Sequence, residues 1–154
     1  MKWKYNTQQE LGESDEESTA AIEALLAGKM NVGGSSGGGG GGAVRAIEND
    51  IYFYGDVSES NALELNSTLH AVDKKLAVSG QFMDVNPIIN LRINSYGGSL
   101  FAGLATLDTI RNLNAEVHTY IDGAAASAAT IISAAGTKRY IGKYSKMLIH
   151  QLSS

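Results

Sequence analysis

Several features that mark a class of protein are missing from this sequence. It contains no cysteine, which excludes disulfide bridges, thiolate metal sites and a cysteine nucleophile. No apolar run approaches the length of a membrane-spanning helix, about 18 residues. The first residues, MKWKYNTQQE, hold two lysines but no apolar core after them, unlike a secretory signal. We therefore expect no membrane span and no secretion signal.

A clustered excess of basic residues is also missing. The formal net charge is −4; residues 1–31 hold three lysines and six acidic residues, and the rest of the chain holds nine basic and ten acidic residues. Nucleic-acid-binding domains present a basic face. No nucleic-acid partner and no metal site are expected.

The N-terminal region reads as a separate extension. SDEESTAAIEALLAGK (14–29) predicts a short amphipathic helix, with Ser14 and Glu17 at the spacing of a capping box and Gly28 near its end. Its acidic residues suit the first turn of a helix, where negative charge is favoured. We expect an acidic extension over residues 1–32.

A glycine-rich segment follows the extension. Eight of the 18 glycines of the chain lie within residues 33–42, and such a segment cannot bury enough surface to offset its ordering entropy. A phosphate-binding loop would need Gly-Lys-Ser/Thr leading into a helix, whereas Ala-Val-Arg follows here. The segment is predicted to be a flexible linker before a folded domain over 43–154, and this chain is expected to carry no ATPase.

The folded domain alternates predicted strands and helices, which indicates an α/β fold with crossover connections. A helix that starts at Ser58 or Ser60 has apolar residues at helical spacing in Leu65, Leu69, Val72 and Leu76. A later helix, SLFAGLATLDTIRNL, is expected to carry Leu100, Leu104, Leu107 and Ile110 on one face. The other expected elements are strands at 51–57, 88–94 and 115–122, a helix from Ser127 to Gly136, and extended pieces in KRYIG and MLIHQ.

Two strand-to-helix turns contain residues that can bind a ligand or take part in catalysis. In INSYGGSL, adjacent glycines permit positive φ, and their free N–H groups can receive an anion or a carbonyl oxygen. In IDGAAASAAT, Gly123 is expected to end the strand, and Ser127 falls near the first turn of the next helix among small alanines. That is the pattern of a nucleophile elbow. The alternative is a buried alanine-rich helix with Ser127 as its N-cap.

A serine nucleophile needs a base, and three histidines are available. His70 lies on a predicted helix, where a surface position is expected, and His118 lies within a strand. His150 ends a short apolar strand, from which its side chain can point over the sheet edge. A serine–lysine pair is a neighbouring alternative, with the base taken from Lys138, Lys143 or Lys146.

Four motifs together resemble the family of the Clp protease proteolytic subunit, ClpP. The family shows Asn-Ser-Pro-Gly-Gly, Ala-Gly-x-x-x-x-Asp-Thr-Ile, Gly-x-Ala-Ala-Ser and Met-Ile-His-Gln in this order. This chain has INSYGGSLFAGLATLDTI, IDGAAASAAT and MLIHQ, and the similarity runs from about Ile51 to Ser154. The alanine-rich variant and SYGG look closer to virus-encoded and other divergent members.

The resemblance assigns roles to residues of this chain. Ser127 matches the nucleophile, His150 the general base, and Gly98 and Ala128 the residues whose N–H groups form the oxyanion hole. Asp122 matches no catalytic residue. Substrate-binding positions are matched by Gly97, Ser99, Leu100 and Gln151.

The resemblance also implies a fold and a biochemical setting. The fold would be the spiral of β-β-α units that ClpP shares with crotonases. The activity would be a serine endopeptidase that cleaves unfolded polypeptides through an acyl-enzyme. It would act in a homo-oligomeric, heptameric ring fed by a separate AAA+ unfoldase, or in virus head maturation. ATP would be used only by that partner, no cofactor would be bound, and the location would be the cytoplasm, of the host if virus-encoded.

The chain departs from the family pattern in three places. Tyr96 stands where the family usually has Pro, and Ala129 where it usually has Gly. The third triad residue of the family, an Asp, is expected several dozen residues beyond His150 and is absent from this chain, as is most of the helix-and-strand handle that joins two rings. Two other functions stay open: a non-catalytic ring or assembly subunit, and a crotonase-type acyl-CoA enzyme.

Overall fold

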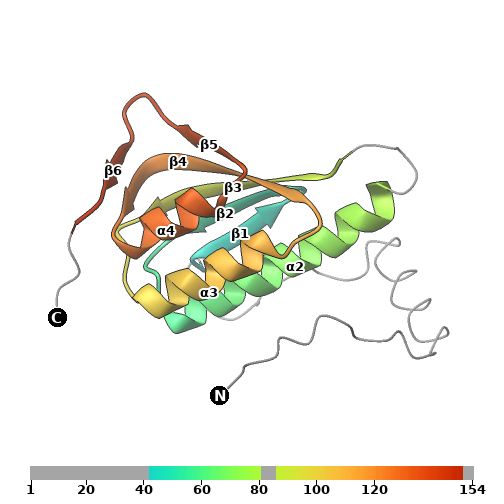
Figure 1. Cartoon of the computed structure of the whole chain (residues 1–154), viewed down its shortest axis with the longest axis horizontal. Coiled ribbons are helices and arrows are strands. Elements are labelled where there is room, and N and C mark those ends of the chain that lie inside the picture. The colour runs from blue at the N-terminus through green and yellow to red at the C-terminus, as the bar shows by residue number, and fades with distance from the viewer. Residues whose placement is uncertain (1–41, 81–85, 151–154) are drawn as a thin grey trace, which may run out of the picture. The chain divides into compact units, whose positions relative to one another are not determined.

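The computed structural model describes residues 42–80 and 86–150. They form one six-stranded sheet and three helices (Figure 1). The predicted helix over 14–29, and the predicted linker up to residue 41, lie outside the described residues.

The strands pair in the order β1-β2-β3-β4-β5, and β6 also pairs with β4. β1 and β2 are antiparallel, and every other pair is parallel. The bounds are β1 Val44–Ile47, β2 Asp50–Tyr54, β3 Ile88–Ser95, β4 Glu116–Ala126, β5 Lys138–Ile141 and β6 Lys146–Leu148. Only β1 was not expected from the sequence, because four residues are too few for a clear alternation.

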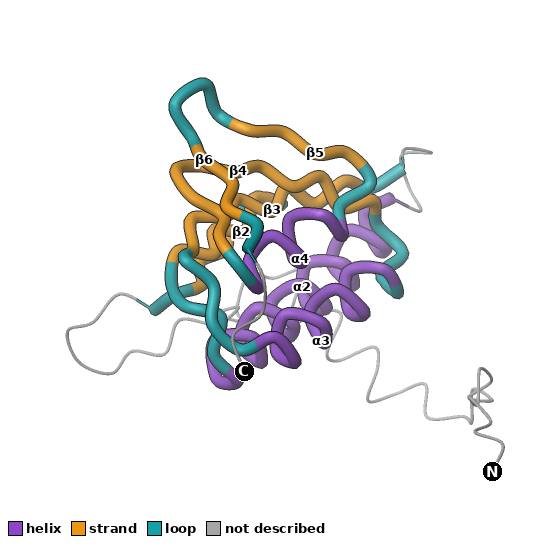
Figure 2. Tube along the Cα trace, turned by 60° about the vertical axis from the view of Figure 1, so that its left-hand side comes forward, coloured by secondary structure: helices purple, strands orange, loops and turns teal. Residues whose placement is uncertain are grey.

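Three helices connect the parallel strands in succession: α2 Glu59–Gly80, α3 Leu100–Arg111 and α4 Ala128–Ala135. They lie together on one face of the sheet (Figure 2). The expected α/β class with crossover connections is therefore confirmed. β5 and β6 line the same edge of β4 one after the other, at residues 118–121 and 124–126 of β4.

Helix α2 forms as its sequence predicts. The Oγ atom of Ser58 accepts a hydrogen bond from the N–H of Asn61 at 3.2 Å, which satisfies one of the free donors at the helix start. Leu65, Leu69 and Val72 are buried against the sheet. Burial of each such side chain stabilises the fold by about 1.5–3 kcal/mol.

Helix α3 confirms the expected apolar face only in part, because Ile110 is buried and Leu107 packs against the core. The face that packs inward consists of Ala102, Gly103, Thr106 and Ile110, whereas Leu104 is 40% exposed. The reason is the close approach of α4, because a Cβ atom added to Gly103 would lie 3.2 Å from the carbonyl oxygen of Ala128. Small residues fit this contact and leucines do not.

The sheet has a buried face and an open face. Ile89, Leu91 and Ile93 of β3 alternate inward and are fully buried. Between them Arg92 points to the other side, where its guanidinium carbon lies 5.9 Å from the ring centroid of Tyr52 and 5.0 Å from that of Tyr120. The open face is thus polar and aromatic, as alternation along a strand requires.

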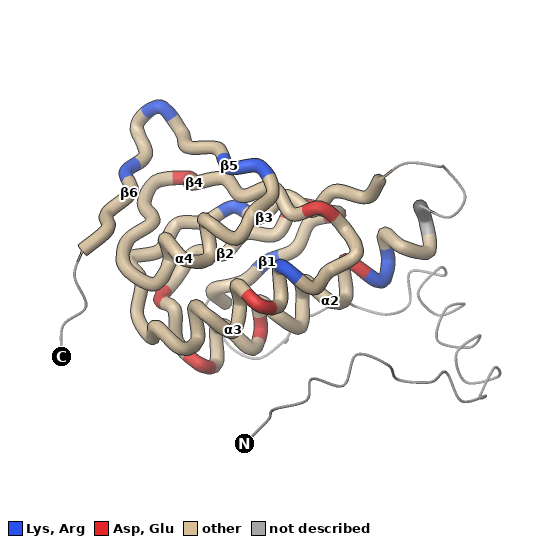
Figure 3. Tube along the Cα trace, viewed as in Figure 1, with Lys and Arg blue, Asp and Glu red and all other residues tan. Residues whose placement is uncertain are grey.

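Charges are interspersed along most of the described chain (Figure 3). The β5–β6 segment differs, since it carries Lys138, Arg139, Lys143 and Lys146 and no acidic residue.

Candidate active site

Ser127 lies at the turn from β4 into α4. Its φ of 52° and ψ of −124° are unfavourable for a residue with a side chain, and only Glu48 shares a positive φ among the described non-glycine residues. The N–H of Ser127 donates to the carbonyl oxygen of Leu148 in β6 at 3.0 Å. The strand therefore delivers Ser127 through a sharp, strained turn, as in a nucleophile elbow.

The end of the strand differs from the sequence expectation. β4 continues to Ala126, so Gly123 does not end it. The strand continues because β6 pairs with residues 124–126, which gives this last part of β4 a ladder of its own. The alternative role of Ser127 as a helix cap is not observed, because its side chain makes no capping hydrogen bond.

The glycine turn after β3 lies directly against this elbow. Gly97 has a φ of 97°, and a Cβ atom added there would lie 2.6 Å from the carbonyl oxygen of Ala126 and 2.7 Å from the Cβ of Ser127. Only glycine allows the two turns to approach so closely. The turn is further held by Val57, whose N–H donates to Gly97 and whose carbonyl accepts from Ser99.

Two backbone N–H groups are left facing this region. Within residues 42–80 and 86–150, the N–H of Gly98 donates to no carbonyl, since the bonds to Val57 use its neighbours on both sides. Ala128 is the first residue of α4, so its N–H has no partner within the helix. Both residues line the pocket that contains Ser127.

A pocket of about 250 Å³ brings these groups together with a histidine. Ser127 and His150, which are 23 residues apart in the sequence, both line it. Apolar side chains make up much of the rest of the wall. The full lining is Gly98, Leu100, Ser127, Ala128, Thr130, Ile131, Ile149 and His150.

The other histidines lie elsewhere. His118 is buried, with its Nε2 atom 3.4 Å from Glu116 Oε2 and its ring 6.2 Å from that of Tyr140, on the open face of the sheet. His70 is exposed on α2. Of the three histidines, only His150 reaches the pocket of Ser127.

Ser99 has a capping role in the structure. Its Oγ atom accepts from the N–H of Ala102 at 3.3 Å and donates to Glu59 Oε1 at 3.3 Å. Its backbone N–H donates to Val57, and its carbonyl accepts from Gly103. Its predicted contact with a substrate stays a prediction, and Gln151 lies outside the described residues.

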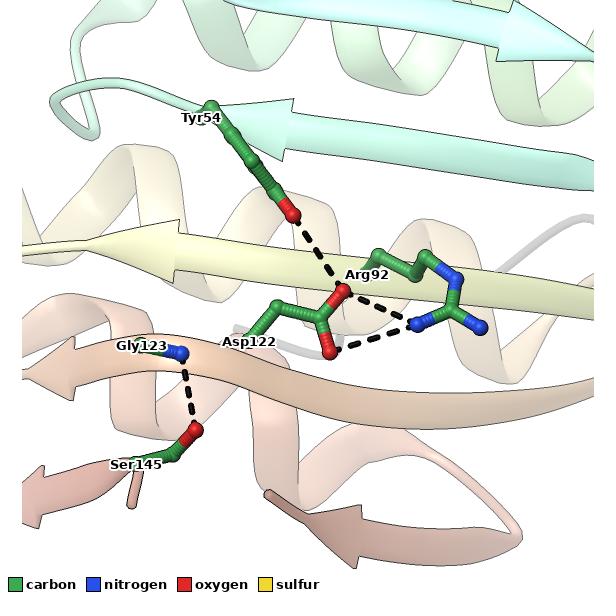
Figure 4. A network of polar contacts seen from close by, with 5 residues as sticks. All are labelled: Tyr54, Arg92, Asp122, Gly123 and Ser145. Atoms are coloured by element: carbon green, nitrogen blue, oxygen red, sulfur yellow. Dashed lines mark hydrogen bonds and ion pairs between the residues drawn. The ribbon is translucent and has the colours of Figure 1, made fainter. Parts of the chain in front are cut away.

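The structure adds a group of residues that the motifs did not single out. The N–H of Ala124 donates to Asn94 Oδ1 at 3.1 Å, and the N–H of Gly123 donates to Ser145 Oγ at 2.8 Å. The Asp122 carboxylate accepts two hydrogen bonds from Arg92 Nη1, at 2.9 and 3.3 Å, in an arrangement that Figure 4 shows. Asn94 was within a motif, but no local pattern marks a bond across 30 residues of sequence.

No metal centre accompanies this site in the described part of the chain, where no three His, Asp or Glu side chains are grouped as ligands. The helices described there include none that is long and apolar enough to cross a membrane.

The fold and the site define a class before any comparison: an α/β protein with a serine on a nucleophile elbow. The family is then settled by the sequence, because the profile of the Clp protease family matches residues 46–154. The chain belongs to the Clp protease family. Its α/β fold is the one that solved ClpP structures share.

Individual relatives agree with this assignment. Over 67 residues the chain is 51% identical to the ATP-dependent Clp protease proteolytic subunit 2 of Chlamydia trachomatis. The aligned residues make up 42% of this chain and 33% of that protein. The ClpP protease catalytic domain of Plasmodium falciparum is similar with a TM-score of 0.58 at 31% identity, over 68% of this chain and 55% of that one. ClpP1 of Listeria monocytogenes shares the fold, with a TM-score of 0.59 at 24% identity, over 68% of this chain and 58% of that one.

The aligned segment thus spans about a third of the curated relative's length and 55–58% of the two solved chains. Activity, substrates and partners therefore remain to be inferred from the site itself.

Proposed function

We propose that this protein is a serine endopeptidase subunit with Ser127 as nucleophile and His150 as general base. One observation carries the proposal: Ser127 is held at a positive φ without a capping bond, in the same pocket as His150 and Gly98. A helix cap needs neither the strain nor the histidine. The strain fits a hydroxyl that is presented to a substrate.

The proposed reaction begins when a peptide carbonyl enters the pocket. His150 takes the proton from Ser127 Oγ as the oxygen attacks the carbonyl carbon, and the carbonyl oxygen becomes an oxyanion. The N–H groups of Gly98 and Ala128 donate to that oxyanion, and loss of one such donor costs about 2.7–4 kcal/mol of barrier in related sites.

The tetrahedral intermediate then collapses. The C–N bond breaks, the amine leaves with the proton returned by His150, and an ester remains on Ser127. A water molecule, deprotonated by His150, attacks the ester, and the carboxylic acid is released with Ser127 protonated again. General base assistance of this kind accelerates the reaction by about 10²–10⁴-fold.

A third triad carboxylate would orient His150. In a triad of this type, loss of that carboxylate lowers kcat by about 10⁴. Turnover of a peptide is an assay of the whole triad at once. Covalent labelling of the serine is a better one, because it registers a single event.

The test is labelling with a fluorophosphonate, read as an adduct by intact mass. One adduct is expected on the wild-type chain, none on Ser127→Ala, and slower labelling on His150→Ala. Ser60→Ala, on the exposed start of α2, is the matched control and should label like the wild type. Absence of labelling in a wild-type chain with native circular dichroism would remove the proposal and favour the non-catalytic assembly subunit.

The substrate, the partner, the location and the assembly are inferred from the curated relatives. The curated relatives are named ATP-dependent proteolytic subunits, so we infer that unfolded polypeptides are the substrate and that a separate ATPase delivers them in the cytoplasm. A homo-oligomeric ring is the proposed assembly, with native mass spectrometry as its test. The Clp family match favours this activity over the acyl-CoA alternative. Fluorophosphonate labelling with no binding of CoA thioesters in calorimetry is the expected pair of results.

A further inference from the structure

The pairing between β3 and β4 is interrupted just before Ser127. It runs without a break from Ile88 opposite Glu116 to Ile93 opposite Ile121, and the next pair is Ser95 opposite Ala125. One residue of β3, Asn94, therefore faces three residues of β4, 122–124. This is a bulge, a feature that bends a strand and can re-aim a side chain beside an active site.

Extra residues in a bulge lose their partners in the ladder, and their N–H groups need other acceptors. Two side chains supply them. Asn94 Oδ1 accepts from the N–H of Ala124 at 3.1 Å, and Ser145 Oγ accepts from the N–H of Gly123 at 2.8 Å. Asn94 comes from β3 and Ser145 from the turn before β6, so the bulge is held from both of its neighbours.

Asn94 also fits the shape of the bulge. Gly123 has a φ of 123°, and a Cβ atom added there would lie 2.9 Å from Asn94 Oδ1. The amide of Asn94 therefore packs directly on the backbone of Gly123. The carbonyl of Asn94 accepts from the N–H of Gly55 at 3.2 Å, which ties the same residue to the segment after β2.

The side chain of Asp122, the first residue of the bulge, is tied on the open face of the sheet. It accepts from Arg92 Nη1 at 2.9 Å and from the hydroxyl of Tyr54 at 3.2 Å, so the contacts span β2, β3 and β4 (Figure 4). Arg92 and Asp122 are 33% and 26% exposed, and such pairs contribute little to stability. They connect Asp122, the residue at which the bulge begins, to β2 and β3.

The bulge decides the register of the two strands that lead to the site. The ladder with β6 starts at the last residue of the bulge, where Ala124 pairs with Lys146, and it ends with Ala126 opposite Leu148. β4 then enters Ser127, and β6 runs on to His150. A slip of one residue along a strand turns every side chain to the other face, so this short ladder determines whether the serine and the histidine meet.

Ser145 lies where that register is set. It immediately precedes β6, and its hydroxyl binds the N–H that immediately precedes the ladder with β6. Asn94 fixes the first residue of the same ladder from the opposite side.

We propose that Asn94 and Ser145 are positioning residues of the active site, which hold the bulge of β4 so that Ser127 and His150 face each other across the pocket. The proposal rests on the proposed peptidase function. Neither residue lines the pocket of Ser127, and each acts through the backbone of Gly123 or Ala124.

The test measures fluorophosphonate labelling of the full chain over a range of probe concentrations, which separates probe affinity from the rate of serine phosphonylation. Asn94→Leu keeps a side chain of similar volume and removes the oxygen that accepts from Ala124. Ser145→Ala removes the hydroxyl that accepts from Gly123. Both are expected to slow phosphonylation by about 10–100-fold, because small misplacements of a nucleophile cost up to about 10². Probe affinity should stay unchanged.

Conservative variants should restore the rate. Asn94→Asp and Ser145→Thr keep an oxygen acceptor at the same place, so they should label close to the wild-type rate. The matched controls are Asn49→Leu, which removes an asparagine bond to the carbonyl of Ile88 at the other end of β3, and Ser67→Ala, which removes a serine bond within α2. Both should label like the wild type, whatever they do to the melting temperature.

The outcomes separate the two ideas. A wild-type chain that does not label contradicts the proposed function, and the inference with it. A wild-type chain that labels, with Asn94→Leu and Ser145→Ala as fast as the controls, overturns only the inference. If Asn94→Leu does not fold, Ser145→Ala decides alone, since Ser145 lies in a turn at the edge of the sheet.

Discussion

Two serines stand at the same position of two neighbouring strand-to-helix turns, and they are used in opposite ways. Ser99, between β3 and α3, has a φ of −61° and a ψ of 121°, and its side chain accepts from the third N–H of the helix. Ser127, between β4 and α4, has a φ of 52° and a ψ of −124° and makes no such bond. The first is an ordinary cap, and the second is not.

The difference means that Ser127 lowers the stability of the fold, whereas Ser99 raises it. A serine cap is worth about 1 kcal/mol to a helix, and a non-glycine residue at an unfavourable φ and ψ costs about 1–3 kcal/mol. Ser127 forgoes the first and carries the second. Such strain persists only where the surroundings impose it, and here Gly97 and the carbonyl of Leu148 hold the turn from two sides.

The largest effect on this comparison is expected from Gly97→Ala. The new Cβ would lie 2.6 Å from the carbonyl of Ala126 and would sit at a φ of 97°, so the two turns must move apart. Positive φ and overpacking together should lower the free energy of unfolding by about 2–5 kcal/mol, measured by urea denaturation. Labelling of Ser127 should fall as well.

Gly103→Ala is the matched control for this change. Gly103 lies on α3 next to Ala128, at an ordinary helical φ, and its added Cβ would approach the Ala128 carbonyl to only 3.2 Å. A change within about 1 kcal/mol is expected, because the gain in helix propensity offsets mild crowding. If Gly97→Ala and Gly103→Ala lower the free energy of unfolding equally, the contact of Gly97 with the elbow turn is no more demanding than an ordinary helix contact.

The two turns also show what the sequence could reveal. Gly123, the small alanines and Ser127 predicted an elbow, and the structure has its strained turn. The capping of α2 by Ser58 was equally local and is confirmed. These predictions succeeded because the signal lies within a few residues.

The errors arose where distant segments meet. The sequence places the leucines of α3 on one apolar face with Ile110, but Leu104 is 40% exposed. Gly103 lies toward α4 instead, where an added Cβ atom would be 3.2 Å from the carbonyl oxygen of Ala128. Gly123 predicts the end of a strand, whereas β4 runs on to Ala126 because β6, 22 residues further along the chain, pairs with its residues 124–126. No periodicity carries information about such contacts.

Three variants at the two serines test the strain directly. Ser127→Gly should raise the free energy of unfolding by about 1 kcal/mol, because glycine accepts a positive φ without strain. Ser99→Ala should lower it by about 1 kcal/mol through loss of the cap, and Ser99→Gly by only a few tenths. Urea denaturation of the variants against the wild type measures all three. A loss of stability in Ser127→Gly would mean that Ser127 supports its helix after all, like Ser99.

The smallest effect is expected from the hydrogen bonds that Asp122, shortly before the elbow turn, accepts from Tyr54 and Arg92. Burial, and then the Asp122 carboxylate, raise the pKa of Tyr54, while Arg92 acts against them and Tyr52 adds to the rise. A raised folded-state pKa means that the stabilisation is fully present below the unfolded pKa of about 10 and is lost as pH rises through the folded value. Tyr54→Phe should remove this part of the alkaline decline. The effect should be slight, because Tyr54 is 46% exposed. Urea denaturation from about pH 8 to about pH 11 measures the free energy of unfolding of the wild type and of Tyr54→Phe. Parallel pH profiles of the two proteins would show that ionisation of the Tyr54 phenol does not change the stability.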